Sequence, residues 1–121
     1  AVRTASHASW MRPAAEAFAA ELQALAFAPP RSWVISNATG SASRDAARLK
    51  QALSRQIDHT VQWQAAMQAL GERQPGCVLE IGPGTSLARL WCQAQPQIPV
   101  RSLDDFQHWR AAAAWVAAHA G

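Results

Sequence analysis

His7 is the residue of this chain whose type and position could carry out acid–base chemistry. It lies just ahead of a segment with helical spacing, near the positive end of the expected helix macrodipole. To serve a serine nucleophile, one ring nitrogen must face the hydroxyl as a general base. The other nitrogen must donate to a fixed acceptor that sets the tautomer. The alternative is an N-terminal histidine with no ordered partner.

Asn37 is a second polar residue at an element boundary, because it follows the short apolar run 33–36 and precedes Gly40. Its side chain can hydrogen-bond nearby backbone and stabilise a turn. The same amide could instead support an active site. Both interpretations remain open from the sequence.

The segment Glu80-Ile81-Gly82-Pro83-Gly84 links an apolar run to a helical one, as phosphate loops do. It is not Gly-x-Gly-x-x-Gly, and it lacks the Gly-Lys-Ser/Thr of a nucleotide-binding loop. Pro83 also removes one backbone donor. We therefore expect a structural strand-to-helix turn here.

These pieces occur in a specific order: His7-Ala-Ser-Trp-Met-Arg-Pro-Ala-Ala-Glu16, Ser36-Asn-Ala-Thr-Gly40, Arg55-Gln-Ile-Asp-His-Thr-Val-Gln-Trp63 and Glu80-Ile-Gly-Pro-Gly84. Together, over roughly residues 2–94, they resemble the C-terminal part of the malonyl-CoA:acyl-carrier-protein acyltransferase family. In that resemblance His7 falls on the catalytic histidine. Gln56 falls on the glutamine whose backbone carbonyl accepts a hydrogen bond from that histidine. Asn37 and Ser6 are implied as supporting residues.

The resemblance implies a two-step acyl transfer in which a serine takes malonyl from malonyl-CoA. The phosphopantetheine-type thiol of an acyl carrier protein then takes it from the serine. His7 would act as general acid and base in both steps. The family's serine lies in Gly-His-Ser-x-Gly, and no Gly-x-Ser-x-Gly occurs in this sequence. The expected partners are therefore the carrier protein and the remainder of the acyltransferase domain, and no tightly bound cofactor is implied.

The segment Thr4-Ala5-Ser6-His7 departs from the many malonyl-specific members that place phenylalanine before the histidine. A small residue there opens the acyl pocket. The Ser-His pair and the tail 98–106, leading to Trp115-Val116, resemble the malonyltransferase (epsilon) subunit of malonate decarboxylase, which would add its other subunits as partners. A fatty-acid or polyketide synthase acyltransferase is the alternative.

A non-catalytic helical interaction domain is a further alternative from a different class. The distance between His7 and Gln56 separates the two classes, because only the catalytic interpretation requires these segments to meet.

Composition narrows the class of protein. The chain has 121 residues and a formal charge of +3, and arginine supplies ten of its eleven basic residues. Those arginines are scattered, which argues against nucleic-acid binding. No apolar run approaches the ~20 residues of a membrane span, and residues 1–12 hold no signal-peptide core. We expect a cytoplasmic protein.

The remaining histidines and the cysteines give no metal-ligand pattern. His59, His108 and His119 are not paired at ligand spacing, so we expect no metal. Cys77 and Cys92 are not part of a CxxC motif, and we expect two reduced, buried thiols.

Alternating helical and strand patterns predict an α/β fold with helices flanking a short parallel sheet. The resemblance implies the C-terminal portion of the hydrolase-like large subdomain. Residues 1–121 would form one C-terminal fragment, with a histidine segment 1–26, a strand and helix core 33–94 and a helical tail 102–119. The six tryptophans are expected to supply much of the core. The expected elements are helices 9–26, 44–57, 60–70 and 85–93, strands 33–36, 77–81 and 98–101, a loop over 37–43 and a helical tail capped by Ser102.

Overall fold

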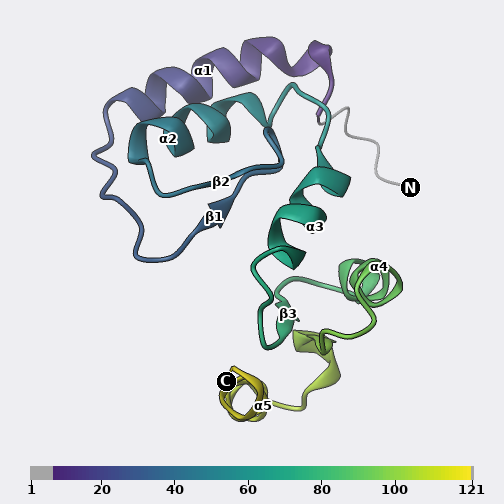
Figure 1. Cartoon of the computed structure of the whole chain (residues 1–121). Helices are drawn as coiled ribbons and strands as arrows, with labels where there is room; N and C mark the ends of the chain where they lie inside the picture. Colours follow the sequence, from purple (N-terminus) through teal and green to yellow (C-terminus); the bar gives the residue numbers. More distant parts are fainter. Residues whose placement is uncertain (1–6, 121) are drawn as a thin grey trace. The chain divides into compact units, whose positions relative to one another are not determined.

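The computed structural model describes residues 7–120, which form two compact units, residues 7–69 and 70–120. Figure 1 shows the helices α1 and α2 side by side in the first unit. The elements of this unit are a 3-10 turn η1 (Ser9–Met11), α1 (Arg12–Gln23), β1 (Val34–Ile35), β2 (Ala42–Ser43) and α2 (Ala46–Arg55); α3 (Trp63–Gly71) ends just past its boundary. The elements of the second unit are β3 (Val78–Glu80), α4 (Ser86–Ala94), β4 (Val100–Ser102), a 3-10 turn η2 (Leu103–Asp105) and α5 (Trp109–His119).

The first helix is shorter than the predicted span 9–26. Pro13 lies in the first turn of α1, where its missing N–H costs no helical bond. At the other end, Ala24 and Leu25 donate to carbonyls three residues back, so the last turn tightens instead of continuing. Lys50 Nζ lies 2.6 Å from the Leu25 carbonyl oxygen and holds the chain as it leaves the helix.

The contacting helices α1 and α2 each bury one alanine and one leucine. Ala15 and Leu22 are buried on α1, and Leu49 and Ala52 are buried on α2. Alanine at such a contact lets two helices approach closely. Asp45 fixes the start of α2, because its carboxylate accepts the N–H groups of residues 47 and 48, and so α2 begins later than the predicted residue 44.

The predicted loop 37–43 contains a strand. Val34 and Ile35 pair antiparallel with Ser43 and Ala42, so the first unit holds a small hairpin that the sequence did not predict. The turn closes because the Ser36 carbonyl accepts two consecutive N–H groups. The second of these belongs to Gly40, whose φ of 65° favours glycine.

The parallel pair of strands lies in the second unit. Val78, Leu79 and Glu80 pair with Val100, Arg101 and Ser102, which confirms the predicted parallel pairing with a shift of one or two residues at the strand ends. The helix α4 lies between these strands in the sequence and contacts both. The α/β class is therefore confirmed, with two separate two-stranded sheets rather than one.

The tryptophan core is a wrong prediction. Trp91 is buried at 2% exposure, whereas Trp10, Trp33 and Trp109 are 82%, 57% and 69% exposed. On α4 the expected inward residues Leu87 and Leu90 are exposed as well. The periodic pattern predicted the helix correctly. It could not show that other elements cover only a small part of the helix's apolar face.

The tail forms two elements instead of one helix. Ser102 caps the 3-10 turn η2 in a capping box with Asp105, as the predicted cap position requires. The chain then turns, and His108 caps the separate helix α5 by accepting the N–H of Ala111. The expectation of a continuous helix from Ser102 is thus corrected. Within residues 7–120 no helix is both long and apolar enough to cross a membrane.

Candidate functional site

The structure brings His7 and Gln56 together across 49 residues of sequence. The Nδ1 atom of His7 lies 2.6 Å from the Gln56 carbonyl oxygen. Gln56 is the C-terminal cap of α2, where carbonyl groups lack a partner within the helix. A carbonyl at a helix end is thus available for the histidine.

The main chain of His7 is anchored at the same place. Its N–H donates to the carbonyl of Ile57 at 2.9 Å. Its φ of 64° lies in the left-handed region, which costs a non-glycine residue on the order of 1 kcal/mol. Two hydrogen bonds to adjacent carbonyls, one from the ring and one from the backbone, hold the residue in this conformation.

The contact with Gln56 determines which ring nitrogen carries the proton. A carbonyl oxygen only accepts, so Nδ1 must be the N–H donor. In a neutral imidazole the other nitrogen, Nε2, then carries the lone pair. The His7 side chain is exposed, so this lone pair can be reached from outside the unit. The arrangement can accept a proton at Nε2 and return it without losing the Nδ1 contact.

A carboxylate next to this contact was not singled out from the sequence. Asp58 has only 9% of its side chain exposed, and its Oδ1 lies 2.6 Å from Nδ1 of His59. Its other oxygen lies 4.0 Å from Nε of Arg12, at the start of α1. The segments 7–12 and 56–59 are therefore joined by a charged pair as well as by the two bonds of His7. In the sequence, Asp58 is only part of a polar segment that interrupts the helical pattern, so nothing there indicated its pairing with Arg12 and His59.

Asn37 lies near Gln56 along one apolar cavity of about 350 Å³. Its carbonyl accepts the N–H of Gln62 at 2.7 Å, which ties the turn to the start of α3. No hydrogen bond of its side-chain amide is found in the described part of the chain, so the expected bond from this amide to nearby backbone is absent. The other residues lining this cavity are Phe27, Ala28, Pro30, Val34, Ile35, Ser36, Ala46, Leu49 and Leu53.

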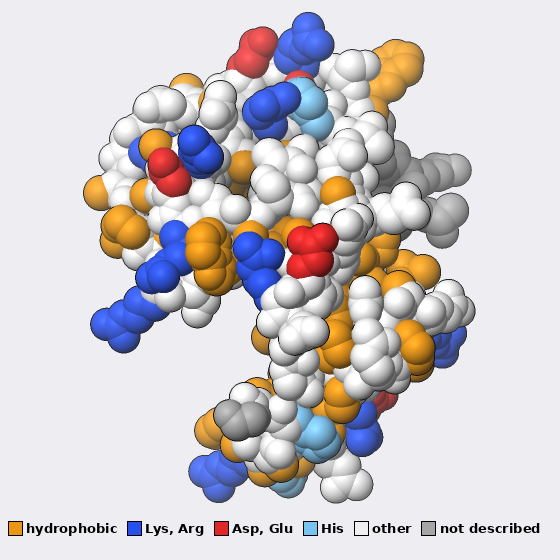
Figure 2. Space-filling view, viewed as in Figure 1, with side chains coloured by type: hydrophobic (Ala, Val, Ile, Leu, Met, Phe, Trp, Pro, Cys, Tyr) orange, Lys and Arg blue, Asp and Glu red, His pale blue; other side chains and the backbone are white. Residues whose placement is uncertain are grey.

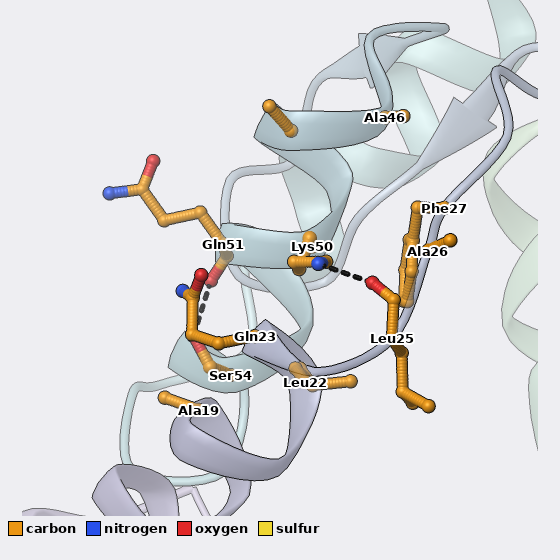
Figure 3. Close-up of a pocket in the computed structure, with 11 residues that line it drawn as sticks. Ala19, Leu22, Gln23, Leu25, Ala26, Phe27, Ala46, Lys50, Gln51 and Ser54 are labelled. Carbon is orange, nitrogen blue, oxygen red and sulfur yellow. Dashed lines mark hydrogen bonds between the residues drawn. The ribbon is translucent and has the colours of Figure 1, made fainter.

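A larger cavity of about 650 Å³ lies where the C-terminal end of α1 meets α2 (Figure 3). Lys50 reaches across it to the Leu25 carbonyl, and its Nζ lies 5.2 Å from the centre of the Phe27 ring. Neither His7 nor Gln56 lines this cavity. Its walls are largely alanine and aliphatic side chains, and Lys50 is the one ionisable side chain among its lining residues.

The turn 82–84 in the second unit is closed to anions. The two carboxylate oxygens of Glu80 accept the N–H groups of Leu87 and Ala88, at 3.2 and 2.8 Å. The N–H of Gly84 donates to Asp104 at 2.7 Å. The donors that a phosphate would use are thus occupied by the protein's own carboxylates. This agrees with a structural strand-to-helix turn.

The remaining predicted residues are separate from the His7–Gln56 contact or are not described. Ser6 lies outside the described residues. Cys92 is exposed and Cys77 is half-buried, so the expectation of two buried thiols is wrong, and both are free. Residues 7–120 hold no group of three or more His, Cys, Asp or Glu side chains that could bind a metal ion. On the face in view, Lys and Arg side chains are scattered and interleaved with acidic ones (Figure 2).

No family model matches this sequence. Among curated proteins, the chain is 34% identical over 89 residues to a malonyl CoA-acyl carrier protein transacylase of Salmonella typhimurium, covering 74% of the chain and 29% of that protein. It is 37% identical over 89 residues to the polyketide biosynthesis protein PksE of Bacillus subtilis, covering 74% of the chain and 12% of that protein. The chain therefore spans about a third or less of these relatives.

Solved structures give the same result for the fold. FabD from Acinetobacter baumannii matches 97% of the chain with a TM-score of 0.76 and 35% identity, over 37% of its own length. A malonyl-CoA:acyl carrier protein transacylase (FabD) from Xanthomonas oryzae matches 100% of the chain with a TM-score of 0.83 and 28% identity, over 38% of its length. A malonyl-transacylase solved in complex with a type II polyketide synthase acyl-carrier protein matches 85% of the chain at 0.77 and 30% identity, over 33% of its length.

The fold is thus the C-terminal portion of an acyltransferase fold, with helices and short sheets. Over part of its relatives' length, this chain is related to the malonyl-CoA:acyl-carrier-protein transacylase family, in its C-terminal part.

Proposed function

We propose that this chain supplies the general acid–base histidine of a malonyltransferase. The enzyme would move malonyl from malonyl-CoA, through a serine acyl-enzyme, to the thiol of an acyl carrier protein. The observation that carries this proposal is the 2.6 Å contact between His7 Nδ1 and the Gln56 carbonyl oxygen. It fixes the tautomer that leaves Nε2 as a base. Gln56 contributes through its main chain, and its side chain is not required for this role.

In this proposal His7 acts in the same way in both half-reactions. Nε2 accepts the serine proton as the hydroxyl attacks the malonyl thioester, and it then returns the proton to the departing CoA thiolate. In the second half-reaction Nε2 takes the proton of the carrier thiol and returns it to the serine oxygen. The serine and the donors that stabilise the oxyanion would come from residues outside these 121.

The geometry favours catalysis over a purely structural interaction domain. A scaffold gains nothing from holding an exposed histidine in a left-handed conformation. The second bond, from the His7 backbone to Ile57, holds the ring over the end of α2. Relatives named as transacylases support the same interpretation. Asn37, on the neighbouring cavity with Gln56, is a supporting residue in this proposal.

Within this class, we infer the malonyltransferase subunit of malonate decarboxylase as the specific assignment. Its support is the Ala5-Ser6-His7 segment and the tail 98–106. A fatty-acid or polyketide acyltransferase is the alternative, and names among the relatives favour it. Transfer rates to the carrier subunit of malonate decarboxylase and to a fatty-acid carrier protein separate the two. Faster transfer to the fatty-acid carrier would reject the decarboxylase assignment.

The test of the proposed function is malonyl transfer from malonyl-CoA to a carrier protein by the full-length protein and its His7→Ala variant. We expect kcat to fall by about 10³-fold or more, because the variant lacks the imidazole whose Nδ1 contacts the Gln56 carbonyl. His119→Ala is the matched control, because it removes an exposed histidine of the second unit. Near-normal transfer by His7→Ala, with its fold intact by circular dichroism, would reject catalysis by this residue.

A further inference from the structure

A polar cavity of about 310 Å³ lies between the turn 36–43 and α2, within the first unit. It shares only Gln51 with the 650 Å³ cavity, and neither His7 nor Gln56 lines it. No carboxylate lines it, although two arginines do. Its lining residues are Ser36, Thr39, Ser41, Ala42, Ser43, Arg48, Leu49, Gln51, Ala52 and Arg55.

Three hydroxyl groups of this cavity have accepted backbone N–H groups and are left to donate. Ser36 Oγ accepts from Ala38, and Ser43 Oγ accepts from Asp45. Thr39 Oγ1 accepts twice from Ser41, from its N–H at 3.3 Å and from its hydroxyl at 3.0 Å. A hydroxyl has two acceptor sites and one O–H, so the remaining capacity of Thr39 is its proton. These three O–H groups can therefore donate to water or to an acceptor bound in the cavity.

The two arginines add cationic donors on the same side of the cavity. Arg48 and Arg55 are seven residues apart on α2, which places them two turns apart on one helix face. No ion pair or hydrogen bond of the Arg55 side chain is found among residues 7–120. Arg48 lies 3.9 Å from Asp45, but both side chains are more than half exposed, so this pair is weak. Both guanidinium groups are available to a ligand.

We propose that this cavity binds the phosphate group of a phosphate ester. A site that offers only donors, with no acid at its walls, selects an acceptor-only anion. Two guanidinium groups and three hydroxyls offer more donors than the two oxygens of a carboxylate can receive. A phosphate has an additional terminal oxygen and pairs with arginine in two-point fashion. The volume leaves room for part of the group esterified to the phosphate.

The identity of the ester rests on the proposed function. Arg55 directly precedes Gln56, whose carbonyl contacts His7, so the cavity borders the segment proposed for acyl transfer. Both thiol carriers of that reaction bear phosphate: coenzyme A in its nucleotide part, and a carrier protein in its phosphopantetheine arm. The shared chemistry is a phosphate ester at a distance from the reacting sulfur.

The experiment is a titration of the full-length protein followed by backbone amide NMR shifts. The probes are inorganic phosphate, adenosine 3′,5′-bisphosphate for the coenzyme A source, and 4′-phosphopantetheine for the carrier source. We expect saturable shifts in the turn 36–43 and in α2 with one or both esters. The paired Arg48→Gln and Arg55→Gln substitutions should weaken binding by about tenfold or more.

Three further variants keep the test independent of folding and of net charge. Thr39→Val keeps the shape and charge but loses the hydroxyl, and should weaken binding by about threefold; Thr39→Ser keeps the hydroxyl that accepts from Ser41 and should restore it. Arg89→Gln removes an exposed arginine of the second unit and should stay within about twofold of the parent. Equal affinity of the arginine-pair variant and the parent, absence of saturable shifts, or binding of inorganic phosphate with neither ester would each overturn the proposal.

This outcome is distinguishable from failure of the proposed function. His7→Ala should abolish transfer and leave the phosphate-dependent shifts unchanged. If the parent binds the ester but transfers no malonyl, the cavity remains and the catalytic proposal fails. If transfer is normal in the arginine-pair variant and no ester binds, only the phosphate site is rejected.

Discussion

The turn 82–84 in the second unit and the turn 36–43 in the first unit are alike in backbone and opposite in their donors. Both contain glycine in the left-handed region. Residues 82–84 join β3 to α4, whereas residues 36–43 complete the hairpin of β1 and β2 ahead of α2. Around 82–84, Glu80 and Asp104 fill the exposed N–H groups. Around 36–43, hydroxyls of Ser36 and Thr39 accept backbone N–H groups, and these residues line a cavity together with two arginines.

The difference shows that a glycine-containing turn after a strand does not define an anion site. What decides is whether donors remain once the protein has satisfied its own backbone. The second unit uses carboxylates for that purpose, which closes the turn. The first unit uses hydroxyls, each of which satisfies one donor and presents another.

Of the variants that test this comparison, Gly40→Ala, in the turn 36–43, is expected to have the largest effect on stability. A Cβ at this position would meet the Ala65 side chain, lie 3.2 Å from Gln62 Cβ, and face a φ of 65°. We expect the free energy of unfolding of the first unit to fall by about 3 kcal/mol, because backbone strain and overpacking add together. Hydrogen exchange resolved by unit is the measurement. Gly84→Ala is the control, since a Cβ there meets nothing within 4 Å and only its φ is unfavourable; equal losses for both variants would contradict the packing argument.

Ser102→Ala should have the second-largest effect, because it destabilises the turn 82–84 of the second unit. Ser102 is 0% exposed; its hydroxyl donates to the Gly84 carbonyl at 2.6 Å and accepts the N–H of Asp104. Its loss removes two hydrogen bonds, each contributing about 1 kcal/mol, so we expect about 2 kcal/mol of destabilisation. Chemical denaturation of the full-length protein measures it. Ser86→Ala, which changes an exposed serine of the same unit, is the control; a loss no larger than that of Ser86→Ala would show that water replaces both bonds.

Glu80→Ala should convert the closed turn into an open one. Its carboxylate satisfies two N–H groups at the start of α4, so we expect a loss of about 1 kcal/mol. Phosphate, compared with chloride at equal ionic strength, should then slow exchange of the Leu87 and Ala88 amides, because a helix N-terminus with free donors binds anions. The parent should show no such effect at these amides. Protection by phosphate in the parent would mean that Glu80 does not close the site.

Asp58→Asn should have the smallest effect. This nearly buried carboxylate faces His59 and Arg12 and does not line the hydroxyl cavity. Asparagine can keep the contact with His59, and the Arg12 pair is exposed and long, so we expect a loss of about 0.5 kcal/mol. Phosphate-ester binding should be unchanged in the same titration. A change in that affinity would show that the two parts of the first unit are electrostatically coupled.

Local sequence signals were sufficient for most elements. Pro29-Pro30, the apolar run 77–81 and the cap at Ser102 predicted boundaries to within a few residues, because capping and proline effects depend on near neighbours. The site depended on other information. Gln56 acts through a main-chain carbonyl, which any residue could supply, so its proximity to His7 came from a family resemblance and not from its side chain. The catalytic role of the Gln56 carbonyl stays a prediction.

The sequence by itself determined the helical periods, the breaks between them and a histidine ahead of the first helix. Only the tertiary structure decided that residues 34–35 pair with 42–43, that most of Trp10, Trp33 and Trp109 is exposed, and which donors remain free. The physical reason is that periodicity reports the conformation of a segment through neighbours three or four residues away. Satisfying a buried donor or covering an apolar face depends on partners far away in the chain, such as Ile57 for His7.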